Sequence, residues 1–263
     1  MIRSGIGGWT FEPWRGTFYP EKLPAARELE YAASKLTSIE INGTFYRTQS
    51  PASFKSWVKQ TPDDFVFAVK AHRSAVNRKD LSDAAESIEF FLKSGVTQLG
   101  EKLGPILWQM TPFKKFNAEE FDKYFALLPQ KYEGRALRHA VEVRHASFAD
   151  PAFVELARKH GVAIVFVESD KHTPIADATA DFVYLRLEKT QESEPTGYSK
   201  ADIKAWVKRA RAWEKGEAPS DLAQLSPAKK ASARDVFAYF ISGAKVRAPA
   251  AAMAFIEALK SAK

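Results

Sequence analysis

The most informative stretch of the chain is Ser38-Ile39-Glu40-Ile41-Asn42-Gly43-Thr44-Phe45-Tyr46-Arg47. Its first five residues alternate polar with aliphatic side chains, which is typical of a β-strand with one polar and one apolar face. In an antiparallel sheet with one hydrated face, the polar side chains would simply meet solvent. In a closed parallel barrel, Ile39 and Ile41 would pack on helices and Glu40 and Asn42 would face the barrel axis. Polar residues at the carboxyl end of such a strand indicate a site.

The rest of the chain repeats a unit of one strand and one helix. Apolar alternation and β-branched runs predict strands at 2–7, 38–42, 65–70, 104–110, 139–144, 162–167, 182–187 and 236–240. Apolar spacing of three and four residues predicts helices at 25–36, 51–60, 82–93, 118–128, 151–160, 199–213 and 248–259. Such alternation indicates a parallel sheet, and eight units in 263 residues indicate a single-domain (β/α)8 TIM barrel over 1–263. A doubly wound open sheet is the alternative.

Several residues mark where the predicted helices begin and end. Ser50-Pro51 and Asp150-Pro151 combine an N-cap with proline at the first helical position, and Gly161 ends the second of these helices. Ser199 with Asp202 resembles a capping box in which Asp replaces Glu or Gln. The Ala-, Lys- and Ser-rich residues 214–234 are expected to form a long mobile surface loop rather than a separate domain.

Composition limits the possible classes of protein. The chain has no cysteine, no apolar run long enough to cross a membrane and no signal-peptide core at Met1, so a cytoplasmic protein without membrane contact is expected. A net charge of +7 favours anionic ligands or weak nucleic-acid binding, although basic residues that only keep the protein in solution would give the same charge. The sequence does not indicate the oligomeric state.

Polar side chains recur on the inward faces of the predicted strands, near their carboxyl ends. The inward set consists of Glu40, Asn42, Lys70, Gln109, Glu142, Arg144, Glu168 and Arg186. In a barrel these groups converge on one end, where barrel active sites lie. We therefore expect a pocket for a small anionic ligand. The alternative is a structural ion-pair network that closes the barrel.

The residue types assign roles within this pocket. Arg144 and Arg186 could clamp a carboxylate or phosphate through forked donors, and Lys70 would add a mobile charge. Glu40 or Glu142 could transfer a proton if burial raises its pKa. An enzyme with this set would be a hydrolase or a lyase.

Other chemistries have weaker support. The five histidines are scattered, so no metal site or other cofactor is expected. A Gly-x-Ser-x-Gly elbow is absent, and Glu40 and Glu142 lie on the second and fifth strands, which disfavours a glycosidase pair. Trp9 and Tyr46 lie in loops at the same end and could stack on a sugar or base, but they could equally pack over the barrel rim.

The chain resembles the domain of unknown function 72 family, the YecE-like proteins, in motifs spread over nearly its whole length. The motifs are Gly7-Gly8-Trp9 with Trp14 and Phe18-Tyr19-Pro20, Glu40-Ile41-Asn42-Gly43-Thr44-Phe45-Tyr46, Phe67-Ala68-Val69-Lys70, Leu103-Gly104-Pro105-Ile106-Leu107-Trp108-Gln109, Val141-Glu142-Val143-Arg144-His145, Tyr184-Leu185-Arg186-Leu187 and Tyr239-Phe240. The resemblance implies a TIM barrel similar to those of endonuclease IV and xylose isomerase. It implies no activity, because the family has no established one.

Two segments depart from the family pattern. Glu188-Lys189 stands where relatives often have His-Gly, and Ile241-Ser242 where they often have Asn-Asp. Both departures lie on the last two strands, so a role carried there in relatives does not transfer. Tyr239, within the last matching motif, is taken as a ligand-binding residue.

Three hypotheses follow from the sequence. The first is an enzyme or binding protein for a small anion that is phosphorylated or that contains a sugar or nucleotide. The second is a nucleic-acid-binding or endonuclease IV-like protein. The third is a barrel that binds a protein partner through the 214–234 loop.

Overall fold

Eight parallel strands close into a barrel in the computed structural model, which describes residues 1–227 and 233–261. The strands are β1 (Ile2–Gly7), β2 (Ser38–Ile41), β3 (Val66–Lys70), β4 (Leu103–Gln109), β7 (His139–Glu142), β8 (Ala163–Glu168), β9 (Phe182–Leu187) and β10 (Asp235–Phe240). Their order around the barrel is β1-β10-β9-β8-β7-β4-β3-β2, so the first strand pairs with the last. This confirms the predicted (β/α)8 barrel and excludes an open sheet.

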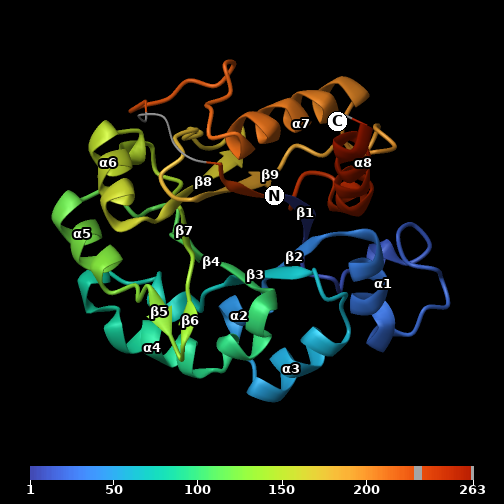
Figure 1. The fold of residues 1–263 in the computed structure, drawn as a ribbon, viewed down its shortest axis with the longest axis horizontal. Coiled ribbons are helices and arrows are strands. Elements are labelled where there is room, and N and C mark those ends of the chain that lie inside the picture. The colour runs from blue at the N-terminus through green and yellow to red at the C-terminus, as the bar shows by residue number, and fades with distance from the viewer. Residues whose placement is uncertain (228–232, 262–263) are drawn as a thin grey trace.

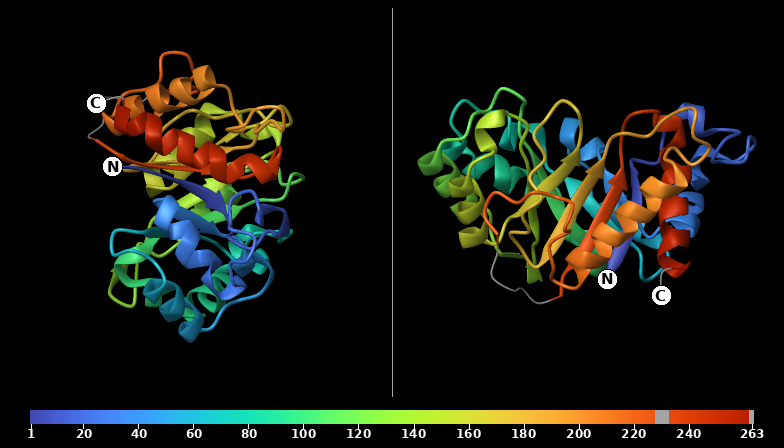
Figure 2. Two further views of the ribbon diagram at one scale, coloured as in Figure 1. Left: turned by 90° about the vertical axis from the view of Figure 1, so that its right-hand side faces the viewer. Right: turned by 90° about the horizontal axis from the view of Figure 1, so that it is seen from above.

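Helices cover the outside of the barrel (Figures 1 and 2). They are α1 (Glu28–Lys35), α3 (Pro51–Lys59), α4 (Ala85–Lys93), α5 (Ala118–Ala126), α6 (Pro151–His160), α7 (Lys200–Glu214) and α8 (Ala248–Ser261). The short helix α2 (Gly43–Tyr46) instead follows the end of β2. Between β8 and β9 the described chain forms no helix. In the right-hand view of Figure 2 the strands point away from the end at which both termini lie. Their carboxyl ends therefore meet at the opposite end, which we call the mouth.

The helix starts that the sequence predicts are present. Ser50 accepts a hydrogen bond from the backbone N–H of Ser53, and Asp150 accepts one from Ala152. Ser199 accepts from the N–H of Asp202 and its hydroxyl also contacts the Asp202 carboxylate. Each cap satisfies one of the free N–H groups of a first helical turn.

The two faces of the barrel wall pack differently. Aromatic and branched side chains on the outer face join the helices in one large core, which includes Phe67, Trp108 and Phe240. A smaller cluster fills the interior of the barrel with mostly small or aromatic groups, including Ala68, Leu107 and Phe237. Above this apolar plug, at the mouth, the inward side chains become polar.

The prediction that Glu168 faces the barrel axis is wrong. Glu168, at the end of β8, points outward, where its carboxylate accepts a hydrogen bond from Trp206 of α7 at 3.2 Å and contacts the Tyr198 hydroxyl. Phe166 lies on the same side of the strand and packs on Trp206 and Trp213. Because side chains alternate along a strand, packing of Phe166 on α7 forces Glu168 outward as well.

A short hairpin that the sequence pattern does not predict lies between α5 and β7. It pairs β5 (Lys131–Tyr132) with β6 (Arg135–Ala136) in antiparallel fashion. The two connecting residues, Glu133 and Gly134, have φ of 45° and 78°, the conformation of a two-residue type I′ turn. Strands of two residues are too short to show alternation in a sequence.

The predicted 214–234 loop is anchored where the structure describes it. The buried carboxylate of Asp177 accepts hydrogen bonds from the backbone N–H groups of Leu225 and Ser226, both at 2.9 Å. Glu155 of α6 also accepts from the Ser226 hydroxyl. The expectation of mobility stays a prediction for 228–232, which lie outside the described residues. None of the described helices combines the length and apolar composition needed to span a bilayer.

Candidate functional site

Arg186 of β9 is the centre of the polar network at the mouth. Its Nε and Nη2 lie 3.1 and 3.2 Å from the two carboxylate oxygens of Glu40, and its Nη1 donates to Glu142 at 2.6 Å. All three side chains are essentially inaccessible to solvent. Glu40 comes from β2 and Glu142 from β7, so one guanidinium group connects three strands far apart in the sequence. Burial alone would lower the pKa of Arg186, but the two carboxylates raise it overall.

A chain of hydrogen bonds leads from Glu142 to the edge of the mouth. Arg144 donates through Nε to Oε1 of Glu142 at 2.8 Å, and Gln109 donates to Oε2 at 2.8 Å. The amide oxygen of Gln109 in turn accepts from Nζ of Lys70 at 2.6 Å. Arg144 is about one quarter exposed. The amide of Gln109 therefore links the cation of β3 to the carboxylate of β7.

Two tyrosines form the floor of the network. The Tyr184 hydroxyl donates to Glu40 at 2.7 Å, and its ring lies 5.0 Å from that of Tyr239. The Tyr239 hydroxyl is 2.7 Å from Oγ of Ser38, which donates to the backbone carbonyl of Val66. Tyr239 is thus fully buried beneath the carboxylates and has no surface that a ligand at the mouth could contact directly.

Asn42 lies beside the network because Gly7 leaves room for it. A Cβ at Gly7 would lie 2.8 Å from Nδ2 of Asn42 and 3.8 Å from Glu40. Asn42 is partly exposed and its backbone carbonyl accepts the first hydrogen bond of α2, from Phe45. The glycine on β1 therefore sets the position of an amide at the rim of the mouth.

The charges at the mouth differ in how readily they lose or gain protons. Burial, together with the positive charge of Arg186, lowers the pKa of Lys70 from 10.5 to about 8. Burial would raise the pKa of Glu142, but Arg186, Arg144 and the hydrogen bond from Gln109 outweigh it and leave that pKa below its ordinary value. Glu142 is consequently held as a carboxylate, whereas Lys70 stays mainly protonated at pH 7 but loses its proton at a lower pH than an exposed lysine does.

Glu188 belongs to the site although the sequence analysis did not include it. Its carboxylate is mostly buried at the end of β9 and lies 3.5 Å from Nη1 of Arg186. Burial raises its pKa; Arg186 opposes this rise and the charge of Glu142 adds to it. Its position two residues after Arg186, on the same face of the strand, could have predicted that it belongs to the site. In the sequence, Glu188-Lys189 stands out only as a departure from the family pattern.

The aromatic residues near the mouth divide into packed and exposed groups. Trp9 packs edge-on against Trp57 of α3, with ring centroids 5.1 Å apart, and also contacts Phe67 on the outer face of β3. Tyr46, by contrast, is 69% exposed and its ring meets that of Phe45 at 5.1 Å. The structure thus places Trp9 in the outer core and Tyr46 in solvent.

An aromatic surface extends from the network into solvent. The amine of Lys70 lies 4.1 Å from the centre of the Phe45 ring, an arrangement typical of a cation–π contact. Beyond Phe45 and Tyr46, the ring of His72 contacts Phe90, which is 54% exposed. We call Phe45, Tyr46, His72 and Phe90 the aromatic rim.

The site contains no obvious set of metal ligands. Within 1–227 and 233–261, no group of three or more His, Cys, Asp or Glu side chains is arranged to hold a metal ion. The buried carboxylates of Glu40 and Glu142 instead have guanidinium and amide partners. The acids of the site are therefore satisfied by cationic and amide donors of the protein itself.

Residues 3–263 match the family described as "Protein of unknown function DUF72". The chain belongs to this family. The resemblance seen in the sequence is therefore confirmed, and with it the family's lack of an assigned activity. Among curated proteins, the UPF0759 protein YunF of Bacillus subtilis (strain 168) is 27% identical over 160 residues, which are 59% of this chain. The match spans about half, 55%, of the length of that relative.

Solved structures support the fold. A DUF72 family protein from Thermotoga maritima MSB8 superposes with a TM-score of 0.75 at 24% identity, over 99% of both chains. A second, from Enterococcus faecalis V583, gives 0.72 at 17% identity over 99% of this chain and 96% of the other. SacUVDE gives 0.56 at 9% identity over 100% and 99%. At these identities the likeness concerns the barrel alone.

Proposed function

We propose that the mouth binds a small anion through Lys70 and Arg144. The observation that carries this proposal is the unequal use of the three cations. Arg186 is buried and its N–H groups donate to Glu40 and Glu142. Arg144 is partly exposed and donates to only one oxygen of Glu142. Lys70 has three N–H donors and, among the described residues, gives one of them to Gln109. Donors thus remain on the two cations nearest solvent.

Arg186 has a different role in this proposal from the one the sequence indicated. It holds the carboxylates of Glu40 and Glu142 in place and offsets their charge, so that an anion can approach Lys70 and Arg144. Without Arg186, two buried negative charges would repel any anionic ligand. Arg186 is therefore a positioning residue.

The acids of the site support proton transfer during hydrolysis or elimination. Glu142 is held ionised by its partners, whereas burial favours the protonated form of Glu188. When the environment pushes the pKa values of two neighbouring carboxyl groups apart, one can act as a general acid while the other stays ionised and stabilises positive charge. We assign proton donation to Glu188 and charge stabilisation to Glu142. Glu40, bonded to both Arg186 and Tyr184, completes the buried part of the site.

The aromatic rim narrows the class of ligand. Tyr46 and Phe90 are exposed to solvent, and Tyr46 packs on Phe45, whose ring contacts the amine of Lys70. Exposed aromatic rings stack on flat groups such as a nucleobase, an aryl ring or the apolar face of a sugar. The ligand that fits best is an anion that also carries such a ring, for example a mononucleotide or an aryl phosphate.

Thermal unfolding with and without ligand tests the proposal. Phenyl phosphate and adenosine monophosphate should each raise the Tm of the wild-type protein more than inorganic phosphate does, because a ligand that binds only the folded state stabilises it. Arg144→Gln should abolish the shift. Lys55→Gln removes an exposed positive charge from α3 and serves as the matched control. Equal shifts for Arg144→Gln and wild type would refute the site.

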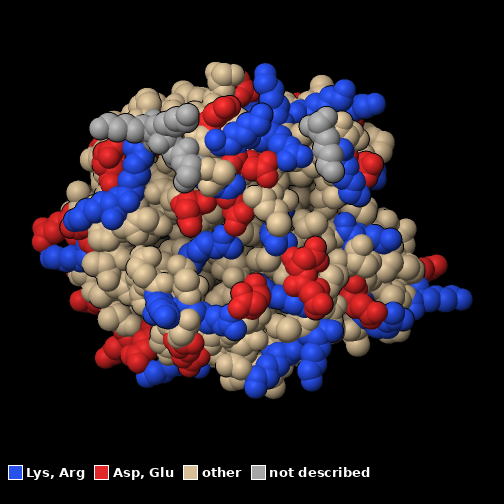
Figure 3. Space-filling view, in the orientation of Figure 1, with Lys and Arg blue, Asp and Glu red and all other residues tan. Residues whose placement is uncertain are grey.

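Nucleic-acid binding has less support at this end of the barrel. The three cations of the mouth lie among three acids, Glu40, Glu142 and Glu188, which would repel a phosphate backbone. On the opposite end of the barrel, which faces the viewer in Figure 3, Lys and Arg side chains are mixed with Asp and Glu. Filter binding of a DNA duplex at several salt concentrations separates the two functions, because backbone binding would weaken steeply with salt.

A further inference from the structure

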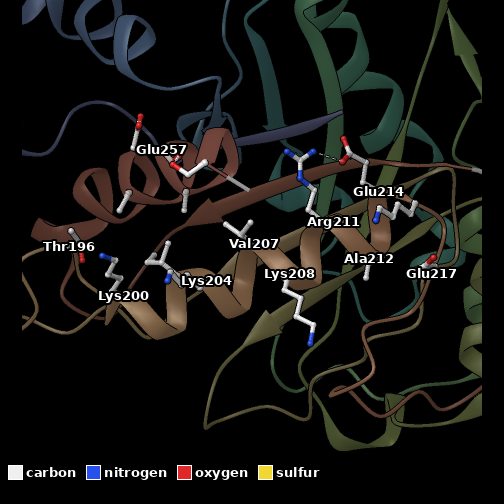
Figure 4. A pocket seen from close by; sticks show the side chains of 15 residues that line it. Thr196, Lys200, Lys204, Val207, Lys208, Arg211, Ala212, Glu214, Glu217 and Glu257 are labelled. Carbon is white, nitrogen blue, oxygen red and sulfur yellow. Dashed lines mark hydrogen bonds and ion pairs between the residues drawn. The ribbon is translucent and has the colours of Figure 1, made fainter. Parts of the chain in front are cut away.

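A groove on the outer surface of the barrel lies between α7 and α8 (Figure 4). It has a volume of about 1170 Å³. Its apolar part is formed by Ile203 and Val207 of α7 and by Ala254 and Ala258 of α8. The small alanine side chains leave the space between the two helices open.

Lysines dominate the polar part of this groove. Lys200, Lys204, Lys208 and Lys215 all line it and are exposed. In Figure 4, Lys200 extends from α7 toward the side of α8, whereas Lys208 extends from the other side of α7, away from α8. Residues 200–217 hold six Lys or Arg against three Asp or Glu, and so account for three of the seven net positive charges of the chain.

These lysines repel one another. Lys200, Lys204 and Lys208 are spaced four residues apart on one helix, a like-charge arrangement that destabilises helices. Within residues 1–227 and 233–261 none of the four lysines forms an ion pair, whereas Arg211 is paired with Glu214, and Glu257 with Lys260. An acidic partner would relieve this repulsion.

We propose that the groove between α7 and α8 binds an amphipathic, acidic helix of another protein. An apolar stripe on that helix would lie on Val207, Ala254 and Ala258, and a row of Asp or Glu beside the stripe would meet the lysines of α7. Lys200 to Lys215 spans about 22 Å along the axis at ~1.5 Å per residue. The partner helix is therefore about 15 residues long, a common size for helix-in-groove recognition.

The composition of the groove favours a helix over a nucleic acid. A phosphate backbone gains nothing from an apolar floor, and Glu217 at the end of the groove would repel it. A protein helix can present apolar, acidic and basic side chains on different faces and so match all three kinds of surface. This site is independent of the one proposed at the mouth.

Fluorescence anisotropy with designed peptides tests the proposal. The probe is a labelled 18-residue helical peptide with Glu at four-residue spacing beside a Leu stripe, and the reference is a permuted peptide of the same composition. The patterned peptide should bind wild-type protein at least tenfold more tightly than the permuted one. Lys204→Glu/Lys208→Glu should weaken it at least tenfold, and Ala258→Trp, which fills the floor without changing charge, at least fivefold.

Two controls make the result decisive. Lys55→Glu/Lys59→Glu makes the same charge change on exposed residues of α3 and should alter binding less than twofold. Arg144→Gln should leave binding unchanged, since it affects only the mouth. The proposal is overturned if the permuted peptide binds equally well, if Ala258→Trp has no effect, if a DNA oligonucleotide of similar length binds more tightly, or if the patterned peptide does not bind.

Discussion

The guanidinium group of Arg186 and the carboxylate of Glu40 meet in a two-point ion pair, with Nε 3.1 Å from one oxygen and Nη2 3.2 Å from the other. Both side chains are buried, and the third arm of Arg186 reaches Glu142. Ion pairs in such positions stabilise little by comparison with apolar residues, but the loss of one partner is costly. The pair therefore explains how acids and a base can be kept inside the barrel beneath its mouth.

Replacement of Arg186 should be far more damaging than replacement of Arg144. Arg186→Met leaves two buried carboxylates without their guanidinium and should lower the free energy of unfolding by about 3–5 kcal/mol. Arg144→Met, at a partly exposed position, should cost less than about 1–2 kcal/mol. Urea denaturation measures both. Addition of Glu40→Gln and Glu142→Gln to Arg186→Met should recover part of the loss; if the triple variant is less stable still, the buried charges are not the cause.

Lys70 should make stability depend on pH in the alkaline range. Its pKa in the folded protein is about 8, against 10.5 ordinarily, so between these values the unfolded chain binds more protons and unfolding becomes less favourable as pH rises. Lys70→Met removes the free-energy cost of burying a protonated amine in the folded protein. Its free energy of unfolding should exceed that of wild type by up to about 3 kcal/mol below pH 8, and the difference should shrink by pH 10.5. Lys55→Met, an exposed control, should show no such trend.

Glu188 should act in the opposite direction on the acidic side. Because burial raises its pKa above 4.5, the folded protein binds more protons than the unfolded chain above that pH, and stability falls as pH rises. Glu188→Gln should therefore gain stability relative to wild type between pH 4 and pH 8. Chemical denaturation at several pH values detects this. A constant difference between the two proteins would show that Glu188 ionises normally; Glu86→Gln on the exposed face of α4 is the control.

Two glycines at the mouth should respond differently to alanine. In Gly7→Ala the new Cβ would lie 2.8 Å from Asn42 and 3.0 Å from Ile241, so the amide must move, at a cost of about 1–3 kcal/mol. Gly43→Ala meets only Gln49 at 4.0 Å within α2 and should stabilise by about 0.5–1 kcal/mol. Thermal unfolding distinguishes them. Equal effects would mean that Asn42 is not held against β1.

Asp177 should control the cleavage of the segment that follows α7. Asp177→Ala leaves the backbone N–H groups of Leu225 and Ser226 without their buried acceptor, at a cost of about 1–3 kcal/mol. Trypsin should then cut within 214–234 several-fold faster than in wild type. Asp221→Ala, which removes only a partly exposed pair with Arg209, should leave the cleavage rate nearly unchanged. Unchanged cleavage of Asp177→Ala would show that these hydrogen bonds do not limit local opening.

The sequence predicted the direction of side chains best in strands where polar and apolar residues alternate. In β2, β7 and β9 polar residues alternate with aliphatic ones, and Glu40, Glu142 and Arg186 all face inward as predicted. In β8 the run from Ala163 to Val167 is apolar throughout, so neither face was marked. The orientation of Glu168 depends instead on the packing of Phe166 against Trp206 and Trp213 of α7.

Tertiary contacts also decided which predicted ligand residues have free donors. The sequence could group Arg144 with Arg186, since both follow the same inward pattern. It could not show that the N–H groups of Arg186 donate to Glu40 and Glu142, because those partners lie 146 and 44 residues away in the chain. Glu188 went unnoticed for a related reason. Its significance comes from burial and from Arg186, not from a motif.

The pairing of β1 with β10 has a consequence for synthesis on the ribosome. The last strand lies more than 220 residues after the first, so a nascent chain cannot close the barrel until almost all of it has emerged from the exit tunnel. Before β10 is in place the barrel that encloses Glu40, Glu142 and Arg186 is open on one side, so their full burial requires this last strand. Variants that weaken the pairing of β1 with β10 should therefore accumulate as open intermediates that chaperones can bind.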